Sequence, residues 1–265
     1  MATPHPYRNG FSVLPNLRRI GVDEVFQTTA DELPKFRKLK QEAMPLQQWH
    51  VEQDCSEEIV AAVREFFLEH SPHPLDRNGT LTELSQSVAE DFIVHRRQNG
   101  KDWMALGYVF LPSQWWPEQQ IGKSFREVHE VVPGMDLTAS EKLVHAMIHS
   151  GPFERFLWSP LFEERLNCHP RFPRAEFDPE NPVLFMKIER QVLVGFPKLE
   201  ASLFILKQSL ISCDEIDHSA LLKTIRSMTP EQLAYKGLTI SGPKLCEWLE
   251  RQTGEWHQRR PEDIG

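Results

Sequence analysis

The stretch VLFMKIERQVL, residues 183–193, decides the fold, because its alternation of side chains is typical of a β-strand with two unlike faces. One face carries apolar side chains and one arginine: Leu184, Met186, Ile188 and Arg190. The other face carries three polar side chains: Lys187, Glu189 and Gln191. A second strand is predicted over residues 201–208, after a proline turn at Phe196-Pro197-Lys198. The pair predicts an antiparallel sheet.

The polar face of this strand has two interpretations. Its side chains can face water, which is common on the open side of an antiparallel sheet and is the more frequent outcome. They can instead line a polar pocket in which a carboxylate orients a cationic or amine ligand. The alternation alone leaves both open.

Working outward, the segments upstream predict a hairpin and three helices. The hairpin joins residues 92–94 to residues 103–111 across Asn99-Gly100 and ends at Pro112. The first helix is predicted over residues 54–69. The second begins at a capping box at residues 80–83 and runs through Val88, at most to Phe92. The third begins at a capping box at residues 138–141 and ends at Gly151-Pro152.

Downstream, residues 167–182 are predicted to form a loop, because four prolines interrupt them. Helices then follow over residues 214–228, from a capping box at residues 229–232, and around Leu245, Trp248 and Leu249. Helices on both sides of a strand-rich middle predict an α+β fold.

The length of 265 residues suits one domain, which we place at residues 20–253, between flexible tails at 1–19 and 254–265. The net charge of −8 makes nucleic acid an unsuitable main partner. Apolar runs are too short to cross a membrane and the first residues lack a signal-peptide core, so we expect a cytoplasmic protein. The four scattered cysteines are expected to be free thiols.

Three features could carry chemistry. His129, in the apolar run VHEVVP of residues 128–133, could stay neutral and bind a metal, although a lone histidine is more often structural. Trp115, which adjoins a second tryptophan, could floor a pocket or cover the edge of the core. Glu141, His145 and His149 share a helix stripe that could bind zinc, but a solvated stripe is the favoured interpretation.

Several motifs together resemble those of the haem-dependent oxidative N-demethylase family. The resemblance begins with FLPSQW at residues 110–115, Gly122 and VHEVVP at residues 128–133. In the family's order, Glu90-Asp91 precedes them, and Glu189-Arg190-Gln191 and Tyr235-Lys236-Gly237-Leu238 follow. The resemblance covers about residues 20–250.

This resemblance implies a PAS-like antiparallel sheet flanked by N- and C-terminal helices, with haem b as cofactor. It implies oxidation of a small secondary amine with O2 to a primary amine and formaldehyde, with electrons from a separate reductase subunit. His129 is then the candidate axial iron ligand. Glu189 is the candidate catalytic acid or amine-orienting carboxylate, Arg190 a candidate partner of a haem propionate, and Trp115 a further cofactor contact.

The sequence also departs from the family pattern. Val131 replaces a proline after the histidine, Val192 replaces a threonine after the Glu-Arg-Gln run, and Leu157 replaces an asparagine before Trp158. Loss of polar groups leaves a second hypothesis, a noncatalytic haem- or ligand-binding PAS-type sensor or partner subunit.

Overall fold

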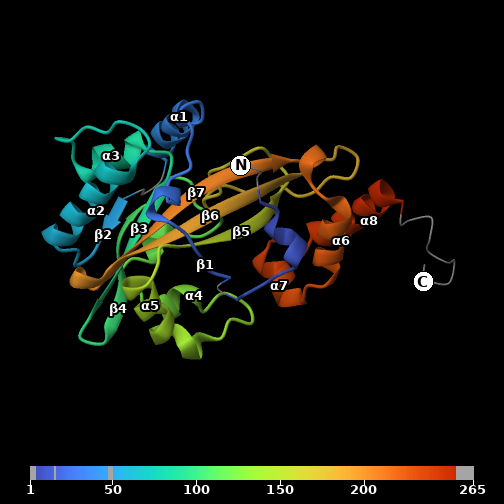
Figure 1. The fold of residues 1–265 in the computed structure, drawn as a ribbon. Helices are drawn as coiled ribbons and strands as arrows, with labels where there is room; N and C mark the ends of the chain where they lie inside the picture. The colour runs from blue at the N-terminus through green and yellow to red at the C-terminus, as the bar shows by residue number, and fades with distance from the viewer. Residues whose placement is uncertain (1–3, 15, 47–49, 255–265) are drawn as a thin grey trace.

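A seven-stranded antiparallel sheet forms the centre of the protein in the computed structural model, which describes residues 4–14, 16–46 and 50–254. The strands lie in the order β1-β5-β6-β7-β3-β4-β2 (Figure 1). Their bounds are β1 Arg18–Arg19, β2 His50–Glu52, β3 Asp91–Gln98, β4 Lys101–Tyr108, β5 Phe153–Leu161, β6 Phe185–Phe196 and β7 Ala201–Ser212. The α+β fold is confirmed, while its PAS-like character stays a prediction.

Two hairpins build most of the sheet. Strands β6 and β7 pair over twelve residues each, and their connection ends at Glu200, whose φ is 47°. Strands β3 and β4 turn at Asn99 and Gly100, whose φ values of 52° and 75° suit the tight turn predicted there. Both hairpins are confirmed, with β4 ending at Tyr108, earlier than predicted.

Eight α-helices flank the sheet within the described residues: α1 Leu33–Ala43, α2 Glu57–His70, α3 Leu81–Ser87, α4 Phe125–His129, α5 Ser140–His149, α6 His218–Arg226, α7 Pro230–Tyr235 and α8 Ser241–Thr253. The capping boxes that begin at Thr80 and Thr229 are confirmed. The box predicted at residues 138–141 is wrong, because the side chain of Asp136 caps a preceding 3-10 turn and α5 has no side-chain cap. Phe92 belongs to β3 and not to the helix before it.

Each face of the sheet has its own apolar packing. The face covered by α4 and α5, called here the α4 face, packs Phe125, Val144, Met147, Ile148 and Leu193 together. The opposite face carries two larger clusters. One lies under α1–α3 and the other under α6 and α8, at the two ends of the sheet (Figure 1).

Parts of the N-terminal segment are anchored to the domain. Tyr7 is fully buried, its hydroxyl accepts a hydrogen bond from the Asp217 amide, and its carbonyl accepts one from Thr224. Arg18 and Arg19 pair with β5. The flexible tails stay a prediction: within residues 1–19 these positions contact the domain, whereas residues 1–3, 15 and most of the predicted tail 254–265 lie outside the described residues.

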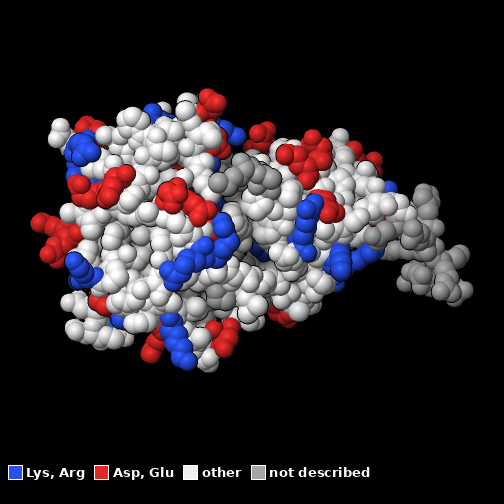
Figure 2. Space-filling model, in the orientation of Figure 1, with Lys and Arg blue, Asp and Glu red and all other residues white. Residues whose placement is uncertain are grey.

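The charge distribution over the visible surface is mixed. Figure 2 shows acidic side chains over the end that carries α1–α3 and along the top of the other half, with short groups of basic side chains near the middle. That face thus has no continuous basic surface of the kind that follows a nucleic-acid backbone. In the part of the chain that the structure describes, every helix is too short or too polar to span a bilayer.

Candidate functional site

Two of the three polar side chains of β6 are buried on the α4 face, and the third is partly covered. Lys187 and Glu189 are 1% and 4% exposed, and Gln191 is half-buried. Directly paired residues share a face, so Arg155 of β5, opposite Gln191, and Gln208 of β7, opposite Glu189, join this row. The solvated interpretation of the row is therefore wrong, and the polar side chains belong to the interior.

Glu189 lies at the centre of the row and accepts three side-chain hydrogen bonds. Ser113 Oγ donates to Oε2 at 2.6 Å, Gln208 Nε2 donates to the same oxygen at 2.9 Å, and Gln191 Nε2 donates to Oε1 at 2.6 Å. Donors of this kind replace the water that a carboxylate loses on burial. They also fix the carboxylate in one orientation.

Arg155 supplies a positive charge to the same row. Its Nε donates to Gln191 Oε1 at 2.7 Å. Burial lowers the pKa of Arg155, and the charge of Glu189 opposes that change. The pKa of Tyr235, at the end of α7, is raised by burial, and the charge of Arg155 opposes that change. An arginine stays protonated under such a shift, so Arg155 supplies a fixed positive charge to the row that contains Glu189.

Lys187 organises the segment that carries Ser113. Its ammonium donates to the carbonyls of Leu111, Pro112 and Leu166 at 3.1, 3.1 and 2.6 Å. From the other side, the Asp91 carboxylate accepts hydrogen bonds from the amides of Phe110 and Leu111. Strand β4 ends at Tyr108 because the amides of Phe110 and Leu111 donate to Asp91 and not to a neighbouring strand. Two buried charges thus place Ser113 against Glu189.

A second lysine ties α7 to the edge of the sheet. Lys236 is buried, its ammonium donates to the carbonyl of Trp158 and lies 4.5 Å from the centre of the Trp158 ring. Burial lowers the pKa of Lys236 to about 8, and the charge of Glu189 opposes that change. This contact ties the C-terminal end of α7 to β5.

His129 ends helix α4, a short helix that begins at a capping box formed by Ser124 and Glu127. Its Nδ1 lies 2.7 Å from the carbonyl oxygen of Phe125, and its ring stacks on the Phe125 ring at 4.0 Å between centroids. A carbonyl can only accept, so Nδ1 carries the hydrogen and Nε2 has the lone pair. Burial lowers the pKa of His129 to about 4, against the effect of the Phe125 hydrogen bond, and Arg155 lowers it further.

The structure brings His129 and Glu189 to one side of the sheet. The charge of Arg155 acts on both side chains: it lowers the pKa of His129, and the charge of Glu189 raises the pKa of Arg155. Arg155 itself lies on β5, a strand outside the predicted elements, and only its position opposite the Glu189-Arg190-Gln191 run could have indicated it.

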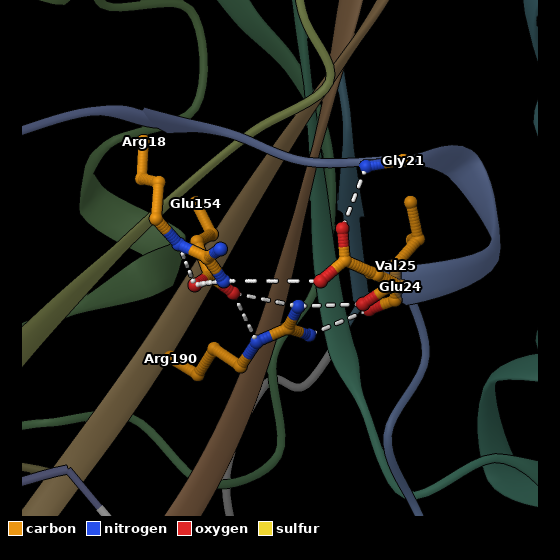
Figure 3. A network of polar contacts seen from close by, with 6 residues as sticks. All are labelled: Arg18, Gly21, Glu24, Val25, Glu154 and Arg190. Atoms are coloured by element: carbon orange, nitrogen blue, oxygen red, sulfur yellow. Dashed lines mark hydrogen bonds and ion pairs between the residues drawn. The ribbon is translucent and has the colours of Figure 1, made fainter.

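Arg190 lies on the opposite face, away from this row. Its Nε donates to Glu154 at 2.9 Å, and Nη1 and Nη2 donate to the carbonyls of Val25 and Glu24, both at 2.6 Å (Figure 3). Arg18 reaches the same carboxylate of Glu154 from β1. This network joins the N-terminal segment to the sheet, and it separates Arg190 from His129 and Glu189.

The remaining predicted site residues are placed as follows. Trp115 is half-buried, two residues beyond Ser113. His145 and His149 are exposed on α5 and both lie beside the guanidinium of Arg97, at 3.5 and 3.4 Å. No cluster of three or more His, Cys, Asp or Glu side chains suited to a metal ion occurs in residues 4–14, 16–46 and 50–254.

Val192 and Leu157, which depart from the family pattern, lie differently relative to Glu189. Val192 is buried on the opposite face from Glu189, so the threonine it replaces would not point to the polar row. Leu157 pairs directly with Glu189 and therefore puts an apolar side chain beside the carboxylate.

Several motif segments, far apart in the sequence, are thus joined through β6 and its neighbour β5. Asp91 and Lys187 hold the segment that contains Ser113, Ser113 binds Glu189, and Lys236 ties the end of α7 to β5, which pairs with β6. The family model described as haem-dependent oxidative N-demethylase, alpha subunit-like, matches residues 22–246 and includes all of these segments. The match spans most of the chain, which therefore belongs to the haem-dependent oxidative N-demethylase, alpha subunit-like family.

Proposed function

We propose that this chain binds haem b through Nε2 of His129 and oxidises a small secondary amine with O2 to a primary amine and formaldehyde. Electrons would come from a separate reductase subunit. The observation that carries the proposal is the state of His129: a neutral imidazole whose Nδ1 hydrogen is engaged by the Phe125 carbonyl and whose Nε2 keeps its lone pair.

The residues around His129 fit a haem ligand in their donor chemistry. Iron binds the neutral imidazole, and a hydrogen bond from the other ring nitrogen sets the tautomer of such a ligand. When bound, haem would supply the activation of O2 and the transfer of electrons. Arg155 lies on the same face as His129, so it suits a haem propionate better than Arg190, whose donors are engaged on the opposite face.

Glu189 is the proposed amine-binding carboxylate. A protonated secondary amine carries one positive charge and two N–H donors, which match the two oxygens of a carboxylate. Hydrogen bonds from Ser113, Gln191 and Gln208 hold Glu189 in place, so its charge needs no reorientation when an amine binds. The same carboxylate can accept the proton that frees the nitrogen lone pair of the substrate.

Reconstitution with haemin tests the iron ligand. The purified protein should develop a Soret band, and His129→Ala should shift or lose it. His145→Ala is the matched control, because it removes an exposed histidine from a neighbouring helix. If His129→Ala and the unsubstituted protein give the same spectrum, or if neither has a Soret band, His129 is not the ligand.

Amine turnover tests Glu189. With a reductase present, Glu189→Gln should keep the Soret band and lower formaldehyde release from a secondary amine such as dimethylamine by about 100-fold, the usual effect of a proton-transfer or charge-binding group. Equal formaldehyde release from both proteins would contradict the assignment.

A noncatalytic haem- or ligand-binding role is the second candidate, and Leu157 favours it. Its apolar side chain lies directly opposite Glu189, where the family pattern has a polar asparagine. A protein that binds haem and changes its spectrum with CO or O2, but releases no formaldehyde from any secondary amine, would support this candidate over the first.

A further inference from the structure

Phe125 connects His129 to a polar pair at the base of α4. Its carbonyl oxygen receives the His129 hydrogen bond at 2.7 Å and its ring stacks on the imidazole. Its amide donates to Oδ2 of Asp102 at 2.7 Å. One residue therefore sets the position of His129 through both its ring and its carbonyl, and Asp102 sets the position of that residue.

Asp102 is in turn held by His95. Nε2 of His95 donates to the same oxygen of Asp102 at 2.7 Å, and the His95 ring meets the Phe125 ring edge-on at 6.3 Å. His95 is 5% exposed and lies where the pairing of β3 with β4 shifts register. Such a bulge changes the direction of a side chain, which here reaches across the hairpin.

Asp102 is an ionised acceptor in this arrangement. Burial would raise its pKa, but the hydrogen bonds from His95 and from the Phe125 amide outweigh burial and lower the pKa below its usual range. A charged acceptor forms the stronger kind of hydrogen bond with an amide at the first turn of a helix.

We propose that Asp102 and His95 are positioning residues for His129: they fix the backbone and ring of residue Phe125 so that its carbonyl holds the imidazole as the Nδ1–H tautomer, with Nε2 free to bind iron. The inference rests on the proposed function only in naming iron. The tautomer itself is a property of this chain without cofactor.

The hydrogen bonds of Asp102 and His95 do more than cap helix α4. Ser124 and Glu127 already form a complete capping box, in which each side chain accepts from the other residue's amide. Asp102 adds a bond to the one residue that contacts His129 twice. Removing Glu127 should therefore weaken α4 without acting on the His129 tautomer, which makes Glu127→Ala the matched control.

The first arm uses the protein without haem. Long-range proton–nitrogen NMR spectra report the tautomer of each histidine, and His129→Gln identifies the His129 signals by their loss. The unsubstituted protein and Glu127→Ala should show His129 as the Nδ1–H tautomer. Asp102→Ala should show a mixture of tautomers, and Asp102→Asn should restore one, because its side-chain oxygen can still accept from the amide. An unchanged tautomer in Asp102→Ala would overturn the proposal.

The second arm adds haemin. Asp102→Ala should bind haemin about tenfold more weakly than the unsubstituted protein, within the usual effect of losing an outer partner of a metal ligand, whereas Asp102→Asn and Glu127→Ala should stay within about twofold. An equal loss in Glu127→Ala and Asp102→Ala would overturn the proposal in favour of plain helix stability. If Asp102→Ala changes the tautomer but His129→Ala leaves the haemin spectrum unchanged, the positioning role holds and the proposed iron ligand fails.

Discussion

Acidification should destabilise the protein through His129. The pKa of His129 falls from its usual 6.5 to about 4 in the folded protein, chiefly because of burial. Between these two values the unfolded chain binds a proton that the folded chain does not, so stability is complete above pH 6.5 and is lost as the pH falls toward 4. The two pKa values give a loss of about 2 kcal/mol between pH 7 and pH 5.

Urea unfolding of the protein without haem measures this loss. The free energy of unfolding should fall between pH 7 and pH 5 by about 2 kcal/mol more in the unsubstituted protein than in His129→Gln, a large part of a total of roughly 5–15 kcal/mol. Burial also lowers the pKa of His50, so His50 contributes to the pH dependence of stability as well. Both proteins contain His50, so its contribution cancels in the comparison. His145→Gln, at an exposed position, should follow the unsubstituted protein. Equal losses in His129→Gln and the unsubstituted protein would refute the burial of a neutral His129.

Three further substitutions test the supporting structure. Lys187→Met should lower the free energy of unfolding by about 3 kcal/mol, because three buried carbonyls lose their donor, and a loss below about 1 kcal/mol in urea would contradict this account. Arg190→Met should lower the free energy of unfolding by about 3 kcal/mol or more in the same assay, because Arg190 is buried. Arg18→Met should lower it by less than about 1 kcal/mol, because the Arg18 side chain is 62% exposed. Similar losses in the two variants would mean that burial does not decide how much each arginine contributes. Gly237→Ala should lower the thermal midpoint of unfolding clearly more than Gly10→Ala. Both glycines have positive φ, but only at Gly237 does an arginine side chain occupy the place that a Cβ would take. Equal shifts of the midpoint in the two variants would exclude the clash.

Local patterns were sufficient to predict the hairpins and most helices. The Asn99-Gly100 turn and the capping boxes at Thr80 and Thr229 depend on a few adjacent residues, and the structure confirms each of them. Strand β5 was not predicted, because its residues alternate weakly and a proline lies within it. Its partners are distant in the sequence, so tertiary pairing with β6 decides its conformation.

The site was predictable only in part, for a similar reason. Alternation correctly separated Glu189 from Arg190, but it could not show that the polar face is buried, since the covering segment that contains Ser113 lies more than seventy residues earlier. Arg155 depends on pairing between β5 and β6, and the Nδ1–H tautomer of His129 depends on a helix of five residues. Neither leaves a periodic pattern in the sequence.

The bond from Lys236 to the carbonyl of Trp158 also sets an order of assembly during synthesis. The chain emerges from the ribosome N-terminus first, and domains fold as their parts become available. Strands β3 to β7 are complete by Ser212, yet Lys236, which ties the end of α7 to β5, follows only after α6 and α7. A chain cut short before residue 236 would therefore contain every strand of the sheet but lack the contact that holds the end of α7 against β5, and helix α8 as well.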